Sequence, residues 1–281
     1  MSCEVVIPHP AANANKYSRG KLVVVAGSAR YPGAAVLAAR ASQRMGAGYT
    51  EVITARRAVD TVRASSPSLV VGAMGDWSET ALPEFTAEKP CAVCVGPGFV
   101  PGAKKSDELL LRVLGAARCP VIVDGGALQQ MAAAKTVERL AQRAADGYST
   151  VITPHAGEAA RLAAPLRLHR AMPDRMAAGL ALALHCIVVL KGPDTYVSNG
   201  KRTEAMTHGG PALAKAGTGD VLAGMIGALL AQGVDPFDAA YSGAALHACA
   251  GTLAAERLTD IAVCAEDVID CIPEVLRQQG R

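Results

Sequence analysis

A glycine-rich loop that runs into a helical pattern is the part of this chain best suited to chemistry. Gly217-Thr218-Gly219 is followed at once by Asp220. Apolar residues at three- and four-residue spacing then predict a helix opened by Asp220 with one buried face: Leu222, Met225, Ile226 and Leu229. Glycines let a ligand approach the backbone, and the free N–H groups of a first helical turn attract an anion. The loop therefore indicates an anion hole for a phosphate oxygen.

Asp220 itself has two interpretations. A carboxylate at a helix start is ordinarily a cap that contributes about 1 kcal/mol. Beside a bound phosphate, however, a carboxylate is repelled, and this repulsion favours a chemical role for it. Taking a proton from a hydroxyl as that hydroxyl attacks phosphorus is such a role. We therefore expect Asp220 to be a general base.

Other short motifs are weaker. The loop is not a Walker A motif, because no Gly-x4-Gly-Lys-Ser/Thr occurs, and it is not a dinucleotide fingerprint, because Leu222 stands where the third glycine would be. Val95-Gly-Pro-Gly98 follows a strand pattern, but an ordinary strand-end turn explains it equally well. Cys91 and Cys94 lie three apart in a strand pattern, so their thiols point to opposite faces and cannot share a metal.

The elements that must position these residues alternate between short β-branched runs and helical stretches. Several runs are continuously apolar, as in strands buried on both faces, and the alternation predicts a mainly parallel sheet covered by helices on both sides. Asn199-Gly200 within Tyr196–Glu204 predicts a two-residue hairpin and an antiparallel edge. The expected strands are Leu22–Ala26, Thr50–Thr54, Leu69–Val71, Ala92–Val95, Val121–Asp124, Thr150–Thr153 and Ile187–Leu190.

Composition limits the class of protein. The 281 residues carry a net charge of +3 and no Lys/Arg-rich run, which argues against nucleic acid as a partner. No apolar run is long enough for a membrane helix, and the first residues lack the pattern of a signal peptide, so we expect a cytoplasmic protein. We expect a single domain over residues 1–281, with residues 1–19 as a surface arm. The region after Asp220 is helical and broken at Gly233 and Pro236.

Several motifs in order resemble one family. Gly217-Thr-Gly-Asp220 resembles the anion-hole and base motif of ribokinase-like enzymes, and four segments resemble the NAD(P)H-hydrate dehydratase branch of that superfamily. A closing segment, Ala265–Asp270, is also typical, and the resemblance extends from about residue 16 to 275. The four segments are Val24-Val-Ala-Gly-Ser-Ala-Arg-Tyr-Pro-Gly-Ala-Ala35, Val95-Gly-Pro-Gly98, Thr153-Pro-His-Ala-Gly-Glu158 and Val189-Leu-Lys-Gly-Pro-Asp-Thr195.

The resemblance implies a ribokinase-like three-layer α/β/α sandwich and a role in nicotinamide nucleotide repair. The C6 hydroxyl of the S-epimer of NADH hydrate or NADPH hydrate would be phosphorylated by ADP or ATP with Mg²⁺. Phosphate would then leave and restore the double bond, with Asp220 as the base. The resemblance also implies a homotetramer and a separate hydrate epimerase as functional partner.

Individual positions follow from the same resemblance. The hydrate would bind at Ala34, Gly98, His155 and Asp220. The nucleotide would bind at Lys191, Gly192, Pro193, Asp194, Thr195 and Gly219, and the anion hole would comprise Gly217, Thr218 and Gly219. His208-Gly-Gly-Pro211 departs from the Asn-Pro pair expected before the loop, which leaves substrate contacts there open.

Each of these positions also has a purely structural interpretation. His155 could be a turn histidine at a helix start, and Lys191 could be a solvated lysine at a strand end. Glu158 and Asp124 are candidates either for capping and turn roles or for a metal shell, and His247 is predicted to be a packing residue.

Two other functions compete with the dehydratase. One is a kinase of the same superfamily acting on a vitamin-precursor alcohol, which would stop after phosphoryl transfer. The other is a non-catalytic nucleotide sensor, which would not need Asp220.

Overall fold

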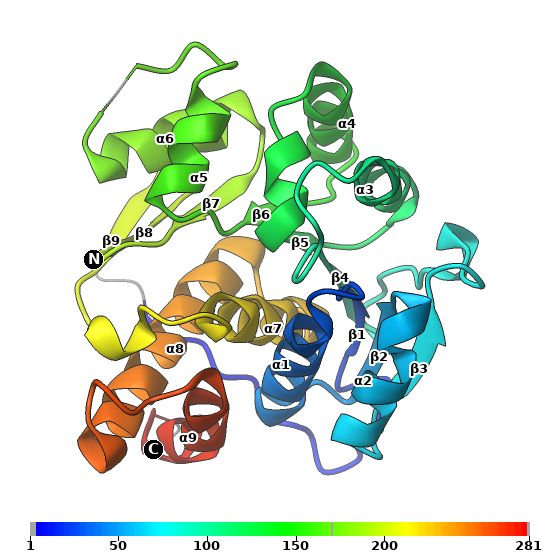
Figure 1. The fold of residues 1–281 in the computed structure, drawn as a ribbon, viewed down its shortest axis with the longest axis vertical. Coiled ribbons are helices and arrows are strands. Elements are labelled where there is room, and N and C mark those ends of the chain that lie inside the picture. Colours follow the sequence, from blue (N-terminus) through cyan, green and yellow to red (C-terminus); the bar gives the residue numbers. More distant parts are fainter. Residues whose placement is uncertain (1–3, 170, 280–281) are drawn as a thin grey trace.

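The computed structural model describes residues 4–169 and 171–279, and its centre is one nine-stranded sheet. The strand order is β3-β2-β1-β4-β5-β6-β7-β8-β9 (Figure 1). The strands are β1 (Lys21–Val25), β2 (Tyr49–Thr54), β3 (Val70–Ala73), β4 (Cys91–Val95), β5 (Val121–Val123), β6 (Thr150–Ile152), β7 (Ile187–Leu190), β8 (Thr195–Ser198) and β9 (Thr203–Met206).

The sheet is mainly parallel, as predicted. Strands β1 to β7 pair parallel with one another, and β8 and β9 are added antiparallel at one edge. Each of the seven expected strands forms within one or two residues of its predicted bounds. Their continuous Val, Ile and Leu runs suit them to burial on both faces.

The predicted edge hairpin forms, but its turn lies one residue further on than expected. The Asn199 amide donates to the Arg202 carbonyl at 3.1 Å, so Gly200 and Lys201 are the central pair. Gly200 has a φ of 86°, the left-handed conformation that a glycine adopts at the first central position of a type II′ turn. The Asn199 side chain accepts from the Lys201 and Arg202 amides instead of standing in the turn itself.

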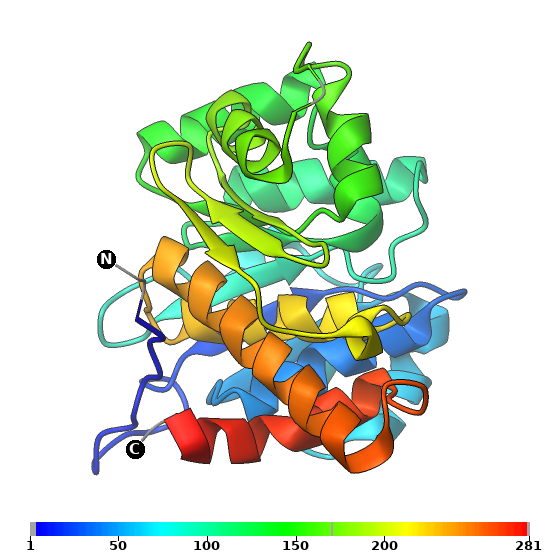
Figure 2. The same ribbon diagram turned by 90° about the vertical axis from the view of Figure 1, so that its left-hand side faces the viewer.

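Helices cover both faces of the sheet, which gives the expected three layers (Figure 2). One core unites the sheet with α1, α2, α7, α8 and α9, and the other unites it with α3, α4, α5 and α6. The helices are α1 (Pro32–Arg44), α2 (Val59–Ser65), α3 (Lys104–Ala116), α4 (Ala134–Ala145), α5 (Ala156–Ala163), α6 (Pro173–Ala183), α7 (Thr218–Ala231), α8 (Pro236–Leu258) and α9 (Ala265–Gln279), with 3₁₀ turns at Arg56–Ala58, Glu79–Ala81, Gly125–Gln130 and Pro211–Leu213.

Helix α7 differs from its prediction in two ways. It begins at Thr218 rather than at Asp220, and it is buried on nearly all sides instead of on one face, because α1, α8, α9 and the sheet surround it. The expected breaks at Gly233 and Pro236 are confirmed, since α7 ends at Ala231 and α8 begins at Pro236. A further break at residues 259–264 separates α8 from α9. Burial of α7 fixes its first turn firmly against the sheet.

The first described residues lie along the body of the protein. The Val6 amide donates to the Ser242 hydroxyl of α8 at 2.9 Å, and the Tyr17 ring stacks on Tyr49 of β2 with centroids 6.0 Å apart. Cys91 and Cys94 belong to the two different cores, which confirms that their thiols face opposite sides of β4. Among the residues described, we find no helix suited to crossing a membrane.

The strand order places a switch point between β1 and β4. The chain proceeds from β1 outward through β2 and β3, then returns to the other side of β1 to form β4. Open α/β sheets bind ligands outside the carboxyl ends of their strands, at such a switch point. The carboxyl edge of this sheet is therefore the place to look for the site.

Candidate active site

The anion loop lies at the start of α7, with its backbone N–H groups free of any side-chain cap. Gly217 is the residue before the helix and has a φ of 96°. A Cβ on Gly217 would come within 2.7 Å of Leu37 of α1 and 3.0 Å of Ala265 of α9, so only glycine fits there. The Thr218 hydroxyl donates to the carbonyls of Leu213 and Lys215 at 2.7 and 2.8 Å. Thr218 thus holds the loop in shape with its side chain.

Asp220 is the third residue of α7 and caps nothing, so the capping interpretation is wrong. Burial raises the pKa of its carboxyl to about 7; the Asp124 carboxylate adds to this rise, and the Lys191 ammonium opposes it. A general base works best when its pKa lies near the working pH, because it is then both available and strong enough to take a proton. Asp220 has these properties at neutral pH.

Lys191 is not the solvated lysine that its strand-end position allowed. Its Nζ donates to Asp124 Oδ1 at 3.1 Å, and the Thr153 hydroxyl donates to the same oxygen at 2.6 Å. A Cβ built on Gly219 would lie 3.2 Å from Lys191 Nζ, so the ammonium group adjoins the anion loop. Burial alone would lower the pKa of Lys191, but the Asp124, Glu158 and Asp220 carboxylates raise it. Lys191 is therefore a firmly charged cation at the mouth of the loop.

His155 and Glu158 form a capping box at the start of α5. His155 Nδ1 accepts from the Gly157 and Glu158 amides at 3.0 and 3.3 Å, and Glu158 Oε2 accepts from the His155 amide at 2.9 Å. The structural interpretation of both residues is thus observed. His155 is also 56% exposed in its side chain, so a contact with substrate stays open to it.

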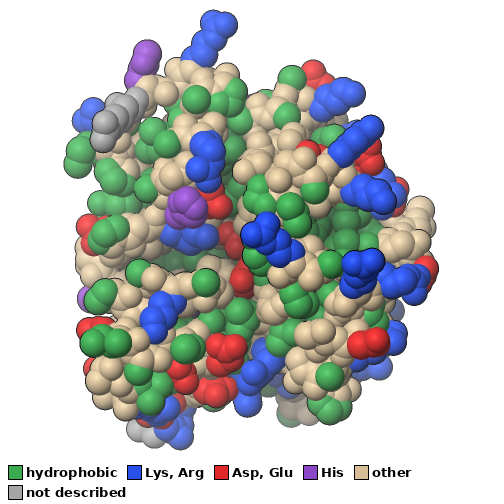
Figure 3. All heavy atoms as spheres, viewed as in Figure 1, with side chains coloured by type: hydrophobic (Ala, Val, Ile, Leu, Met, Phe, Trp, Pro, Cys, Tyr) green, Lys and Arg blue, Asp and Glu red, His purple; other side chains and the backbone are tan. Residues whose placement is uncertain are grey.

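A cavity of about 670 Å³ collects most of the predicted nucleotide residues. Lys191, Gly192, Pro193, Thr195 and Gly219 line it, together with His155. Asp194 instead lines a second, mostly apolar cavity of about 770 Å³ between α5 and α6. The segment Lys191–Asp194 is the wall between the two. Figure 3 shows a hollow in the middle of this face, where basic, acidic and histidine side chains meet.

Ala34 and Gly98 contact each other at the switch point, and neither lines this cavity. Gly98 follows β4 with a φ of 68°, and a Cβ built on it would lie 2.7 Å from the Ala34 Cβ and 2.7 Å from the Tyr31 carbonyl oxygen. Asp220 connects the two regions, because its charge acts on Cys94 near the end of β4 as well as on Lys191. The charge of Asp220 thus reaches both regions, whereas His155, the third predicted hydrate residue apart from Asp220, lines the cavity with the nucleotide residues.

Replacing Gly98 by alanine should impair the predicted hydrate subsite. The added methyl group would be strained by the positive φ and would collide with Ala34, so we expect a loss of stability of about 1–3 kcal/mol and weaker hydrate binding. Affinity for the nucleotide should be retained. Gly147→Ala is the matched control: its φ is 82° but nothing lies within 4 Å of the added group. Equal losses in both variants would show that backbone strain, rather than the contact with Ala34, explains the effect.

The carboxylates near the loop fit a magnesium ion that arrives with a nucleotide. Among residues 4–169 and 171–279, no group of three His, Cys, Asp or Glu side chains could hold a metal alone. Magnesium commonly takes one or two carboxylates and obtains its other oxygens from phosphates and water. Asp124 Oδ2 lies 3.9 Å from the position of a Cβ on Gly219, while both oxygens of Glu158 are engaged with His155. Asp124 is therefore the better ligand candidate.

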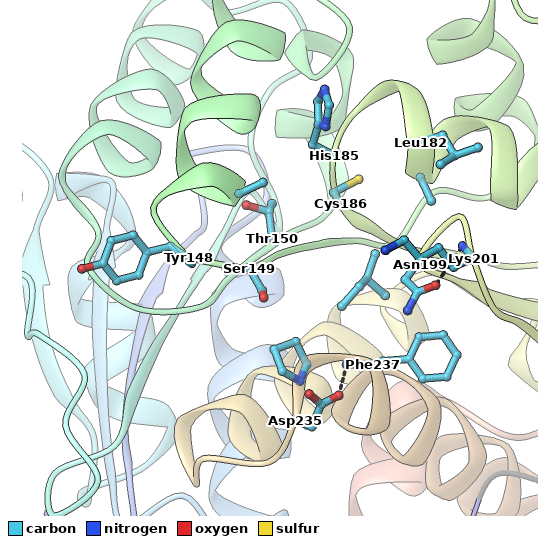
Figure 4. A pocket seen from close by; sticks show the side chains of 15 residues that line it. Tyr148, Ser149, Thr150, Leu182, His185, Cys186, Asn199, Lys201, Asp235 and Phe237 are labelled. Atoms are coloured by element: carbon cyan, nitrogen blue, oxygen red, sulfur yellow. Dashed lines mark hydrogen bonds between the residues drawn. The ribbon is translucent and has the colours of Figure 1, made fainter.

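A further cavity of about 530 Å³ lies at the opposite, amino edge of the sheet, beside the starts of β6, β7 and α8 (Figure 4). The Asp235 carboxylate turns back onto α8 there, where Oδ1 accepts from the Phe237 amide at 2.9 Å. This helix start is thus already capped by a carboxylate, unlike that of α7. No residue that the sequence analysis assigned to the site lines this cavity.

His247 is the residue at this site that sequence reasoning missed. It was predicted to be a packing residue, yet it lines the 670 Å³ cavity with Thr218 and Gly219. Its place within a long apolar helical pattern gave no signal, because a histidine that packs in a core would produce the same pattern.

Comparisons with known proteins show the family of the chain. The family model described as NAD(P)H-hydrate dehydratase matches residues 22–274. The ADP-dependent (S)-NAD(P)H-hydrate dehydratase of Xanthomonas campestris is 32% identical over 98% of this chain and 94% of its own length. A bifunctional NAD(P)H-hydrate repair enzyme of Gloeobacter violaceus is 39% identical over 91% of this chain, which spans about half (49%) of that protein.

Solved structures are similar as well. The crystal structure of an ADP/ATP-dependent NAD(P)H-hydrate dehydratase from Bacillus subtilis, co-crystallised with ATP and Mg²⁺, superposes with a TM-score of 0.82. The two chains are 27% identical, with 97% of this chain and 94% of that chain covered. A ribokinase from Thermotoga maritima, 13% identical, superposes at 0.55 over 90% of this chain and 98% of its own, which shows the shared ribokinase-like fold.

Proposed function

Since the chain belongs to the NAD(P)H-hydrate dehydratase family, we propose that it restores NADH and NADPH from the S-epimers of their hydrates. ADP or ATP is consumed with Mg²⁺, giving AMP or ADP and phosphate. The observation that carries this proposal is the position of Asp220. Its carboxyl group lies in the first turn of α7 without capping the helix, and its pKa is about 7. The Gly217–Gly219 anion loop and Lys191 lie beside it.

The residues divide the reaction between them. Asp220 accepts the proton of the C6 hydroxyl as the hydroxyl oxygen attacks the terminal phosphorus of the nucleotide. The bond from that phosphorus to the nucleotide breaks, and the departing nucleotide keeps the bond electrons. The N–H groups of the loop and the Lys191 ammonium stabilise the charge on the phosphoryl oxygens.

Loss of phosphate completes the repair. Hydroxide is a poor leaving group, whereas phosphate leaves readily with the C6–O electron pair, assisted by the lone pair of the ring nitrogen. A proton then leaves C5, and the C5–C6 double bond is restored. Asp124 is the side chain that would hold a magnesium ion arriving with the nucleotide, and the ion would neutralise phosphate charge there.

The binding sites for the two substrates are those that the family resemblance implies. Ala34, Gly98 and His155 receive the hydrate, while Lys191, Gly192, Pro193, Asp194, Thr195 and Gly219 receive the nucleotide. The single sheet supports one domain for the matched residues. The resemblance further implies a homotetramer in the cytoplasm and a hydrate epimerase that supplies the S-epimer.

The direct test mixes hydrated NADH, ADP and Mg²⁺ with the protein and follows recovery of reduced-nicotinamide absorbance. Recovery should require the nucleotide, and NADPH hydrate should be repaired as well. A well-folded protein that restores neither cofactor but phosphorylates a vitamin-precursor alcohol would be a kinase instead. Binding of ADP without turnover of any substrate would favour a nucleotide sensor.

A further inference from the structure

A small cavity at the carboxyl edge of the sheet has no part in the proposed mechanism. Its volume is about 280 Å³, and it lies between helix α5 and the 3₁₀ turn Gly125–Gln130, which follows β5. None of its lining residues lines the 670 Å³ cavity of the nucleotide residues. The lining residues are Leu128, Gln129, Glu158, Arg161 and Leu162. This cavity is therefore distinct from the one assigned to the nucleotide.

The two elements that enclose the small cavity each adjoin a residue predicted to bind the hydrate. The loop that carries Gly98 continues to Gly102, where a Cβ would lie 3.8 Å from Oε1 of Gln129 in the cavity wall. Helix α5 begins after His155, whose amide donates to Glu158 Oε2 in the same wall at 2.9 Å. A hydrate that contacts both Gly98 and His155 would therefore lie beside this cavity.

Arg161 is the one cation that lines the cavity. Among residues 4–169 and 171–279, its exposed guanidinium makes no ion pair. A Cβ on Gly157 would lie 3.9 Å from Arg161 Nη1 and 3.0 Å from His155 Cε1. The guanidinium and the imidazole thus stand close together over the first turn of α5.

The other polar groups of the cavity leave it open to an anion. Glu158, its one acidic side chain, is only 16% exposed and turns toward His155, with Oε1 lying 3.5 Å from Nε2. Gln129, on the opposite wall from Arg161, carries an amide that can donate. A guanidinium suits a phosphate in such a place, because its planar fork donates two parallel hydrogen bonds to the phosphate oxygens.

The hydrate brings negative charge that its predicted contacts do not meet. NADH hydrate carries a pyrophosphate, and NADPH hydrate carries a 2′-phosphate as well. Ala34 and Gly98 are uncharged, and Lys191 adjoins the anion loop, where it meets the phosphate of the nucleotide. Resting on the proposed function, we propose that Arg161 binds a phosphate group of the hydrate at the cavity between α5 and the 3₁₀ turn.

Calorimetry with the two hydrates tests this assignment. NADH hydrate and NADPH hydrate are titrated without nucleotide, so that binding is measured in the absence of turnover. Arg161→Gln should weaken hydrate binding about tenfold, the equivalent of about 1.4 kcal/mol, and leave ADP binding unchanged. Arg161→Lys keeps the charge but loses the paired donors, and a loss of about threefold is expected. Arg139→Gln on α4 is the control, because this exposed arginine lines none of the cavities described.

The pair of hydrates also identifies the phosphate group. Equal losses for both hydrates would assign Arg161 to the pyrophosphate, and a loss for NADPH hydrate alone would assign it to the 2′-phosphate. Three results would overturn the proposal: unchanged affinity for both hydrates in Arg161→Gln, an equal loss for ADP, or an equal loss in Arg139→Gln. If Arg161→Gln does not fold, Arg161→Lys decides, and unchanged hydrate affinity there would overturn the proposal.

Repair is measured separately from binding. A parent protein that binds the hydrates through Arg161 but restores neither cofactor would refute the proposed function alone. A parent protein that restores both cofactors, with hydrate affinity unchanged in Arg161→Gln, would refute the role of Arg161 alone.

Discussion

Asp220→Asn should lower turnover at least about a hundredfold while the protein stays folded and still binds ADP. Asparagine has nearly the shape of aspartate but cannot take a proton from the C6 hydroxyl. A general base contributes about 10²–10⁴ in rate, or about 3–5 kcal/mol of barrier. Turnover is measured as recovery of reduced-nicotinamide absorbance, and ADP binding by calorimetry.

The same variant should be at least as stable as the parent protein above neutral pH. The pKa of Asp220 is about 7 in the folded protein, well above the value near 4 of an unfolded chain. The folded state therefore binds more protons than the unfolded state between these two values, and stability falls as pH rises through this window. The asparagine side chain carries no charge and so avoids this loss, and the melting temperature at pH 8 should be equal or higher. A large fall in melting temperature would point to a structural role for Asp220.

The rate of the parent protein should depend on pH in the matching way. Because the base must be unprotonated, kcat/KM should fall about tenfold for each pH unit below about 7. This limb should be absent from the residual activity of Asp220→Asn. If the variant turned over at nearly the rate of the parent protein, Asp220 would not be the general base of the reaction.

Lys191→Ala should have the second-largest effect, and it should act on both binding and pH dependence. Loss of a charge-assisted hydrogen bond to phosphate should weaken ADP binding about 10- to 100-fold, with a smaller effect on hydrate binding. Since Lys191 lowers the pKa of Asp220, its removal should also move the acidic limb of the rate profile to higher pH. ADP affinity is measured by calorimetry and the rate profile as turnover at a series of pH values, both with the same preparation.

The partner of Lys191 supplies a control. Lys191→Ala leaves the buried Asp124 carboxylate without its cation, which should destabilise the fold. Adding Asp124→Asn removes that charge, so the double variant should regain stability but not ADP affinity. Lys201→Ala, on the exposed hairpin turn, should change neither the stability of the fold nor the ADP affinity. ADP affinity equal to that of the parent protein in the single variant would reduce Lys191 to a counter-ion for Asp124.

The sequence predicted the parts of this molecule that follow from local pattern. Continuous apolar runs located seven strands, and the glycines before Asp220 located the start of α7 to within two residues, because these features depend on a few adjacent residues. The turn of the hairpin was displaced by one residue, since Asn199 uses its side chain to accept from the amides that follow it.

Features that depend on contacts between distant residues could not be predicted. Lys191 and Asp124 are 67 residues apart, and only the parallel arrangement of strand ends brings them together. The unpaired nitrogen of His247 depends on how α8 packs against α7, and this packing leaves no trace in residue spacing. The position of His155 and Glu158 at a helix start, by contrast, was among the interpretations that the sequence offered, and it is observed.

The measurement that tests the central claim most directly follows the oxygen of the substrate. Hydrated NADH carrying ¹⁸O in its C6 hydroxyl is turned over with ADP and Mg²⁺, and the phosphate released is examined by mass spectrometry. If the hydroxyl attacks phosphorus and the C6–O bond then breaks, each phosphate carries one ¹⁸O from the substrate. If the label appears instead in water while NADH is restored, no phosphorylated hydrate forms, and the role assigned here to the anion loop and Asp220 is contradicted.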